Sequence, residues 1–354
     1  KGIGQVIEAL LITKATSLWG DVPYSQAFDR QNYPNPVYDP QLEVYQKLQA
    51  TLDDAINNLN ATTGLAVGDK DFIYKGDFTK WKKAAYTLKA RLYLHTADYQ
   101  SAVNAATLGI SATSGDALVP HGKSQNVDNN QNYDFFKVKS SGDIGFTGAY
   151  LPVLMNSRIN SANTKTNETA LLKHYATTAT NGNLEPNTTD GAFTADAPHP
   201  IITFYENQLI LAEASARLGN ESAAISALNS VRTVLSTGYM NGKTISATGR
   251  LYENYVAADF APTGLANPKN YSSSQLALLY EIISQRYIVF LMQYESFNDY
   301  RRLSKALPVV ELAIPLSVGT QKPQRFIYPE NEINTNANTP KPVPNQFVKT
   351  PVFN

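Results

Sequence analysis

Aromatic and amide side chains gather in one short stretch of the sequence, "NVDNNQNYDFF", which spans residues 126–136. An aromatic ring offers a flat face to the C–H groups of a sugar, and amides hydrogen-bond to its hydroxyls. The candidate side chains are Asn130, Asn132, Tyr133, Phe135 and Phe136. We therefore predict a binding site for an uncharged, hydroxyl-bearing ligand here. In a second interpretation the rings only attach a long loop to its scaffold.

Two further pairs of residues add to this candidate site. Tyr150 and Arg158 extend the same loop, the first as a stacking ring and the second as a hydrogen-bond donor. Tyr252 and Tyr255 belong to a second long loop and are candidates for an opposing wall. We expect one or two rings to stack on the ligand and the others to hold the loops, because a fully exposed apolar patch would be adhesive.

The stretch "SLWGDVPYSQAF", residues 17–28, interrupts an otherwise helical opening. Trp19 can cover the helix end, and Gly20 allows a sharp turn. Asp21 can accept local backbone N–H groups, and Pro23 directs the chain outward. We interpret the stretch first as a structural corner and second as a ligand contact through Trp19.

Signals for catalysis are weak. Histidine occurs at His95, His121, His174 and His199. Their spacing matches no metal-binding motif, and cysteine is absent, which excludes thiol catalysis and thiolate metal sites. In "STGYMNGKT", Gly238 stands one residue too close to Gly242 for a phosphate-binding loop. We predict no catalytic residue, no metal site and no cofactor.

Paired carboxylates are the remaining route to catalysis, since glycoside hydrolysis needs two of them close together. That pairing is spatial and cannot be read from a sequence. Glu206 and Glu213, like Asp53 and Asp54, lie on predicted helices, where we interpret them as exposed or capping charges.

The composition points to a neutral, hydrogen-bonding surface. Lys plus Arg and Asp plus Glu both number 30, so no net positive field favours nucleic acid. Charged residues make up only 17%, while tyrosine occurs 21 times. No apolar run of about twenty residues is present to span a membrane as a helix. We expect a neutral polar ligand and no nucleic acid.

Apolar residues recur at three- and four-residue steps in several segments, which predicts amphipathic helices. The expected helices cover residues 3–18, 42–59, 77–110 as a hairpin, 202–235 as a second hairpin, and 276–303 as one long helix. We predict that Asp77 and Asp39 are N-caps. In the long helix, we expect Phe297 and Tyr300 to pack inward and Asp299 to pair with a neighbouring arginine.

The two hairpins share a spacing of small residues. Ala90 and Ala102 are twelve positions apart, and so are Ala212 and Ala224. In tetratricopeptide-type hairpins, small residues at this separation let two helices cross closely. The spacing favours a scaffold of helical repeats.

The remaining segments are rich in Asn, Ser, Gly and Thr and predict long loops. We expect a mainly α fold with tetratricopeptide-like hairpins packed against irregular, ligand-facing loops and little β structure. Residues 1–354 form one expected domain, with loop-rich insertions near 119–200 and 238–274. The tail from Val309 is proline-rich and is expected to wrap the scaffold in an extended form.

Six blocks, in order, resemble the SusD/RagB family of outer-membrane nutrient-binding lipoproteins. They are "LWGDVPYSQAF", "YDPQLEVYQKLQATLDDAINNL", "DFTKWKKAAYTLKARLYLHTADYQSAVNAA", "YENQLILAEASARLGNESAAISALNSVR", "ISQRYIVFLMQYESFNDYRRL" and "PQRFIYPENEINTN". Together they extend over most of the chain. The last block is most similar to the RagB-side relatives.

The resemblance implies a non-catalytic lipoprotein on the bacterial cell surface. Its partner would be a SusC-like TonB-dependent transporter of the outer membrane, to which it delivers bound glycan or, in some members, peptide. Family members are anchored through a lipidated N-terminal cysteine, so we expect that residue upstream of Lys1, as the membrane contact. Glycan capture is the leading hypothesis. A peptide- or protein-binding helical scaffold is the alternative, and a glycoside hydrolase is the third.

Overall fold

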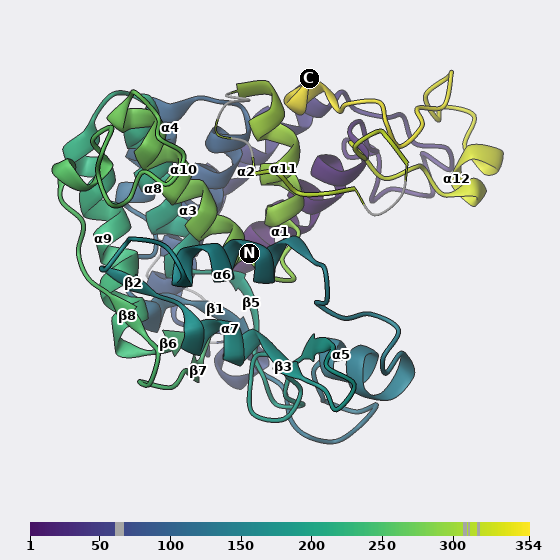
Figure 1. Ribbon diagram of the computed structural model, residues 1–354. Coiled ribbons are helices and arrows are strands. Elements are labelled where there is room, and N and C mark those ends of the chain that lie inside the picture. The colour runs from purple at the N-terminus through teal and green to yellow at the C-terminus, as the bar shows by residue number, and fades with distance from the viewer. Residues whose placement is uncertain (61–66, 307–309, 311, 317–318) are drawn as a thin grey trace.

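The computed structural model describes residues 1–60, 67–306, 310, 312–316 and 319–354, and helices dominate it (Figure 1). The longer helices are α1 (Gly2–Trp19), α2 (Gln41–Leu59), α3 (Phe78–His95), α4 (Tyr99–Thr107), α8 (Phe204–Arg217), α9 (Glu221–Thr237), α10 (Ser274–Val289) and α11 (Glu295–Ala306). The shorter ones are α5 (Gln131–Tyr133), α6 (Tyr150–Ile159), α7 (Thr169–Tyr175) and α12 (Glu330–Thr335). A π-helix covers Asp134–Lys139, and 3₁₀ turns lie at Gly68–Lys70, Thr113–Gly115, Ala257–Phe260 and Pro351–Phe353. The prediction of a mainly α fold is confirmed.

The strands are two to four residues long and pair only in antiparallel twos within the described residues. The pairs are β1 (Ala117–Val119) with β5 (His199–Ile202), β2 (Thr166–Asn167) with β8 (Leu251–Tyr252), β3 (Ala176–Thr178) with β4 (Leu184–Pro186), and β6 (Tyr239–Met240) with β7 (Lys243–Thr244). These short strand pairs link loops to one another, and the packed core consists of helices.

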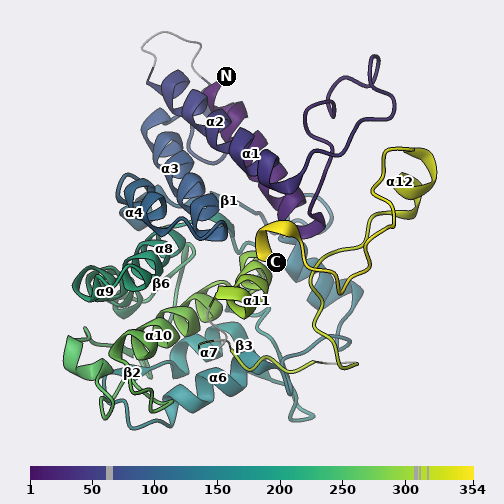
Figure 2. The same cartoon turned by 90° about the horizontal axis from the view of Figure 1, so that it is seen from above.

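The helical core is a curved row of packed hairpins. Helices α1 and α2, α3 and α4, and α8 and α9 pack as neighbours, with α4 against α8 and α10 against α8 (Figure 2). The four alanines of the repeated spacing, Ala90, Ala102, Ala212 and Ala224, are fully buried. Ala90 and Ala102 pack together with Ile210 and Ala214 of α8. Small side chains thus let the hairpins approach closely, as the spacing predicts.

Two of the predicted helix caps differ in outcome. The Asp77 carboxylate accepts the backbone N–H of Lys80 at 3.1 Å, which confirms it as the N-cap of α3. Asp39 is not a cap, because α2 begins after Pro40 and the first N–H of that helix donates instead to Asp21 at 2.8 Å. Asp21 thus accepts a backbone N–H at the corner, but that of Gln41, twenty residues along the chain, and not the local N–H groups predicted.

Asp39 instead holds the loop that follows α1. Its carboxylate accepts the backbone N–H groups of Tyr24 and Ser25, both at 2.9 Å, and the ammonium of Lys47 at 2.6 Å. Partial burial opposes ionisation, but these bonds outweigh it and lower the pKa of Asp39 to about 2.

The stretch 276–303 is two helices, so the prediction of one long helix is wrong. Residues 290–294 separate α10 from α11, and Met292 adopts a positive φ of 61°. The break lets α11 turn so that Asp299 meets Arg286 of α10, with an Nε–Oδ2 distance of 2.8 Å. Residues 290–294 contain no Gly or Pro, so no helix-breaking residue marks this end in the sequence.

The loop-rich region 119–200 is less irregular than predicted, because α5, α6 and α7 form within it. The C-terminal tail runs beside the corner after α1, as an extended, wrapping segment would. The Trp19 Nε1 donates to the carbonyl of Ile327 at 2.9 Å, and the Tyr328 hydroxyl donates to the carbonyl of Asp21 at 2.7 Å.

Candidate ligand-binding site

Helix α11 buries its polar face and leaves two aromatic rings toward the surface. Asn298, Asp299 and the arginines that follow them are buried. Phe297 and Tyr300 are only half-buried, so the prediction that they pack inward is wrong. Because α11 turns its polar face inward, each buried charge on it needs a partner, since an unpaired buried charge is strongly unfavourable.

The partners of α11 come from α8 and α10. Arg302 donates to both carboxylate oxygens of Glu213, at 2.7 and 2.6 Å, and to Asp299 at 2.8 Å. Burial opposes ionisation of Glu213, but Arg302 and Arg217 outweigh it and lower the pKa of that carboxyl. The local pairing predicted for Asp299 is confirmed, whereas the prediction that Glu213 is an exposed or capping charge is wrong.

A second buried network joins α3 to the start of α11. Arg91 forms a two-point ion pair with Glu206, at 2.5 and 2.7 Å, and donates to the Tyr294 hydroxyl at 2.6 Å. The His95 Nε2 lies 2.9 Å from a carboxylate oxygen of Glu295. Glu206 is therefore also a core residue rather than a surface charge, and the two networks fix the orientation of α11.

The outward rings of α11 line a groove of about 590 Å³, here called the aromatic groove. It is lined by Tyr287, Ser296, Phe297, Tyr300, Ile314, Pro315, Leu316, Gly319, Gln321, Pro323, Gln346 and Phe347. The volume lies in the range of small-molecule sites, about 300–1,000 Å³. None of these described lining residues carries a charge, while the Lys322 ammonium lies 5.1 Å from the centroid of the Tyr300 ring.

A row of aromatic rings extends from the groove toward the corner after α1. Phe297 and Tyr300 lie nearly parallel, with centroids 6.4 Å apart and an interplanar angle of 23°. Phe326 continues the row from Phe297 at 6.2 Å and contacts Trp19 at 5.4 Å. The Arg301 guanidinium lies 4.3 Å from the centroid of Phe297, which helps to fix that ring.

Tyr150, one of the predicted stacking rings, reaches the groove indirectly. Its ring packs edge-to-face on Tyr287, with centroids 5.6 Å apart, and Tyr287 lines the groove. Trp19 likewise stands at the end of the ring row rather than inside the groove. Tyr150 therefore supports the groove through one ring, whereas Trp19 is joined to it only through Phe326 and Phe297.

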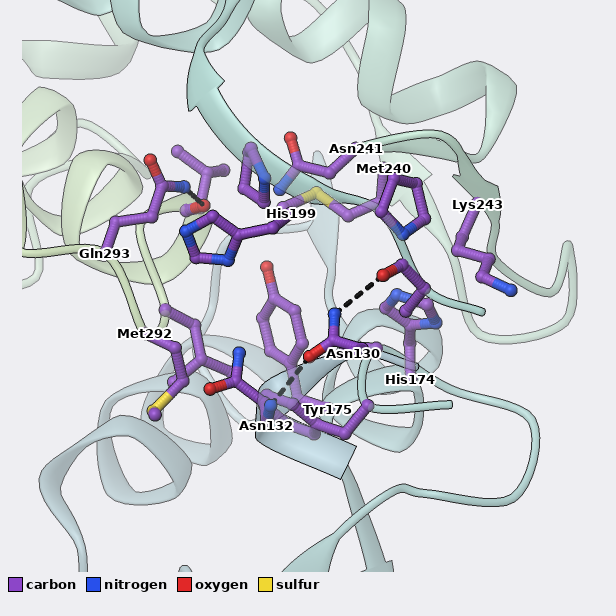
Figure 3. Close-up of a pocket in the computed structure, with 17 residues that line it drawn as sticks. Asn130, Asn132, His174, Tyr175, His199, Met240, Asn241, Lys243, Met292 and Gln293 are labelled. Carbon is purple, nitrogen blue, oxygen red and sulfur yellow. Dashed lines mark hydrogen bonds between the residues drawn. The ribbon is translucent and has the colours of Figure 1, made fainter. Parts of the chain in front are cut away.

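A second, smaller pocket lies between the loops and the scaffold, and we call it the polar pocket (Figure 3). Asn130 and Asn132 line it from the loop of residues 126–136. The Asn130 side chain donates to the carbonyl of Ala197 at 2.6 Å and accepts the N–H of Asn132 at 2.7 Å. Asn130 therefore holds the loop in place, while Asn132 borders the pocket.

The other predicted rings of this loop have different surroundings. Phe136 is buried and packs on Phe193 at a centroid distance of 5.2 Å, so it anchors the loop. Phe135 is 39% exposed and contacts Phe136 edge-to-face at 5.4 Å. Tyr133 is half-buried on α5. The loop therefore divides its rings between anchoring and exposed positions.

The predicted opposing wall is part of the core. Tyr252 and Tyr255 are buried, and the Arg232 guanidinium lies 3.7 Å from the centroid of the Tyr255 ring. Arg158 donates to both oxygens of Glu281, at 2.6 and 2.9 Å, so its guanidinium is held in an ion pair. These three side chains are brought together, but not with the groove or the polar pocket.

The groove residues Tyr287, Tyr300 and Phe347 were absent from the sequence-based candidates. A signal was present for one pair, since Phe297 and Tyr300 stand three positions apart and must share a helix face. Which face is buried depends on Glu213, which lies far away in sequence. Hydrophobicity alone therefore assigns the wrong face.

This architecture defines a class of protein: a scaffold of helical hairpins that presents a neutral, ring-lined groove and loop-built pockets. The chain belongs to the SusD-like family, because the family model described as starch-binding and associating with the outer membrane matches residues 1–329. No curated protein matches the chain.

Solved structures share the whole fold at low identity. A SusD homologue from Bacteroides fragilis is 19% identical with a TM-score of 0.73, and the match covers 99% of this chain and 83% of that one. One from Bacteroides uniformis is 20% identical with a TM-score of 0.71, covering 100% and 81%. A chitin-binding SusD homologue from Flavobacterium johnsoniae is 16% identical with a TM-score of 0.67, covering 99% and 80%.

Within the described ranges, no helix is long and apolar enough to cross a membrane. The same part of the chain contains no group of three His, Asp or Glu side chains arranged to hold a metal ion.

Proposed function

We propose that the protein captures a neutral oligosaccharide in the aromatic groove, without cleaving it, and delivers it to a SusC-like TonB-dependent transporter. The observation that carries the proposal is the set of half-buried rings on α11, which lines an uncharged groove with Gln321 and Gln346 beside it. Rings supply stacking faces for sugar C–H groups, and the amides supply hydrogen bonds to hydroxyls. The family description and the chitin-binding relative support a glycan as ligand.

A binding role without catalysis is supported by the state of the helix carboxylates. Glu206 and Glu213 are held in ion pairs by Arg91 and Arg302. A glycoside hydrolase needs one carboxyl to donate a proton and another to attack or activate water. Carboxylates fixed in the core by arginines supply neither.

The test of capture is a glycan array followed by calorimetry with the best glycan. Tyr300→Ala removes a groove ring, and affinity should fall roughly ten- to a hundred-fold, by analogy with stacked bases. Phe28→Ala is the matched control, because Phe28 is 76% exposed and lies outside the groove lining. An array without any neutral glycan signal, or release of shortened products, contradicts the proposal.

The aliphatic part of the groove favours one second candidate, a peptide. Ile314, Pro315 and Leu316 line it beside the rings. Such a surface accepts apolar side chains as well as sugar faces. Binding of a peptide pool in calorimetry, with a silent glycan array, selects this alternative.

Delivery requires a stable partner at the outer membrane. We propose a lipidated cysteine upstream of Lys1 as the anchor and an interface with the transporter of roughly 2,000 Å² or more. The family's association with the outer membrane supports this location. Fatty-acid labelling of the native protein and co-purification from detergent-solubilised membranes test the two parts. An unlabelled protein recovered without a transporter contradicts them.

A further inference from the structure

Lysines gather at one end of the helical scaffold, in the loop before α3 and in the first turns of that helix. They are Lys70, Lys75, Lys80, Lys82 and Lys83. Of these, only Lys75 forms an ion pair within the described part of the chain, with the exposed Asp69 at 3.4 Å. Five lysines against three aspartates give residues 67–83 a net charge of +2, although the chain as a whole is neutral. This end of the scaffold is therefore locally positive.

Two phenylalanines stand among these lysines with exposed rings. Phe72 is 54% exposed and Phe78 is 37% exposed. Phe78 and Lys82 are four positions apart on α3, so they share one face of that helix. We call the five lysines and these two rings the basic patch. Exposed aromatic rings between lysines are typical of surfaces that lie on membranes, because the rings enter the boundary of the acyl chains while the ammonium groups stay at the headgroups.

The loop that carries Phe72 is held from within by Asp71. Its carboxylate accepts three backbone N–H groups of residues 73–76, at 2.9 to 3.1 Å, and the indole N–H of Trp81 at 2.6 Å. Tyr74 and Trp81 pack inward, edge-to-face, with centroids 5.0 Å apart. Because these bonds fix the loop, Phe72 is presented outward in a fixed position, and little conformational freedom is lost when it meets a surface.

The basic patch lies where α1 begins. The Lys82 Nζ donates to the side chain of Asn60, just after α2, at 3.0 Å, and a Cβ on Gly2 would lie 2.8 Å from Leu59. The first residues of α1 and α3 thus meet at the end of α2. Figure 2 shows α1 running from this end toward the C-terminal tail. Helix α1 has 18 residues and is about 27 Å long, and its far end carries Trp19, the last ring of the row that starts in the aromatic groove.

We propose that the basic patch contacts the surface of an anionic lipid membrane. Phe72 and Phe78 reach the boundary of the acyl chains, and the lysines bind phosphate groups of the lipids. A lysine ammonium is a point charge on a flexible stem, so it reaches a phosphate without a preformed site. In this position α1 leads away from the lipid, which keeps the aromatic groove clear of the headgroups.

A membrane suits the basic patch better than an acidic protein does. A stable protein interface uses about 20–30 residues on each side, whereas the patch consists of five lysines and two phenylalanines. The proposal goes beyond ligand capture and delivery, and it does not depend on a lipid anchor, because it needs only residues 67–83 of this chain.

The test is co-sedimentation of residues 1–354, which carry no lipid, with vesicles. One set is an equimolar mixture of phosphatidylcholine and phosphatidylglycerol, and the other is phosphatidylcholine alone. We expect binding to the anionic vesicles, weak binding to the neutral ones, and release by salt, which screens the lysines. Lys70→Gln combined with Lys80→Gln should weaken binding roughly ten- to thirty-fold. Phe72→Ser should weaken it about ten-fold, because the ring no longer enters the acyl boundary.

Matched controls lie outside the basic patch. Lys137→Gln combined with Lys173→Gln, at two exposed positions, removes the same charge and should bind like the parent. Phe28→Ser removes a ring that is more exposed than Phe72 and should also bind like the parent. A thermal melt checks that each variant is folded.

Three outcomes overturn the proposal. The first is a parent protein that does not sediment with anionic vesicles, and the second is equal binding by patch and control variants. The third is a photoreactive side chain at position 72 that cross-links in cells to a protein instead of lipid, which selects an acidic partner. None of these outcomes affects the glycan-array test, since that test contains no membrane.

Discussion

Arg302 and Glu213 form a two-point ion pair that joins α11 to α8, with guanidinium–carboxylate distances of 2.7 and 2.6 Å. Both side chains are buried, and Asp299 completes the charge balance on the same face of α11. Because this face is turned inward, Phe297 and Tyr300 are turned toward the groove. The ion pair therefore helps to hold α11 in the orientation that presents these rings.

Removing one partner of this pair should be strongly destabilising. Glu213→Ala leaves the Arg302 guanidinium buried without its two-point acceptor, and the free energy of unfolding should fall by about 3–5 kcal/mol. Asp54→Ala, at an exposed position of α2, is the control and should change it by less than about 0.5 kcal/mol. Urea unfolding followed by circular dichroism measures both. Similar values for the two variants would show that the pair does not hold α11.

The loop of residues 126–136 should depend on Phe136 more than on its neighbour. Phe136 is buried against Phe193, whereas Phe135 is 39% exposed. Phe136→Ala removes the packed ring, so the loop should open more often and be cleaved faster by a protease. Phe135→Ala is the adjacent control and should be cleaved at close to the parent rate. Equal rates in the two variants would mean that Phe136 does not anchor the loop.

His174 should weaken folding as the pH decreases from 7 to 5, while Asp116, whose pKa burial raises to about 6, acts in the opposite direction. The folded pKa of His174, about 4, lies below the ordinary value, because burial disfavours the charged ring and Lys243 adds to this. Between about pH 6.5 and 4 the unfolded chain binds a proton that the folded chain does not, so folding weakens there. The expected contribution between pH 7 and 5 is roughly 2 kcal/mol.

The measurement is urea unfolding at both pH values for the parent protein and His174→Gln. Contributions of all other groups appear in both proteins, so their difference isolates His174. Gln125→Ala, at an exposed and uncharged position of the neighbouring loop, is the control and should keep the full pH dependence. An unchanged pH dependence in His174→Gln would contradict the assignment.

The hairpin scaffold could be predicted from sequence because its determinants are local. Ala90 and Ala102 stand at the spacing that close helix crossing requires, and both are buried where the two helices meet. The break after α10 had no such signal, since residues 290–294 contain no Gly or Pro. The position of Tyr255 depends on a distant residue, because Arg232 stacks on its ring and holds it in the core. Hydrophobic periodicity assigns polar residues to the surface, so it misplaces those that are buried in the core.

Tyr150 and Tyr133, the two loop tyrosines predicted to stack on the ligand, should differ in their contribution to glycan affinity. Tyr150 packs on Tyr287, which lines the aromatic groove, whereas Tyr133 lies on α5 and lines neither the groove nor the polar pocket. Tyr150→Ala leaves Tyr287 without its edge-to-face support, so affinity for the best array glycan should fall about ten-fold. Tyr133→Ala should bind like the parent.

Both affinities should change little between low and physiological salt, because the ligand is neutral and no charged side chain belongs to the described groove lining. Calorimetry at two salt concentrations measures both effects, and a thermal melt confirms that each variant is folded. If Tyr133→Ala weakens binding and Tyr150→Ala does not, the glycan contacts the loop of residues 126–136 instead of the groove. A steep salt dependence would instead mean that the ligand is charged, since screening weakens only interactions between charges.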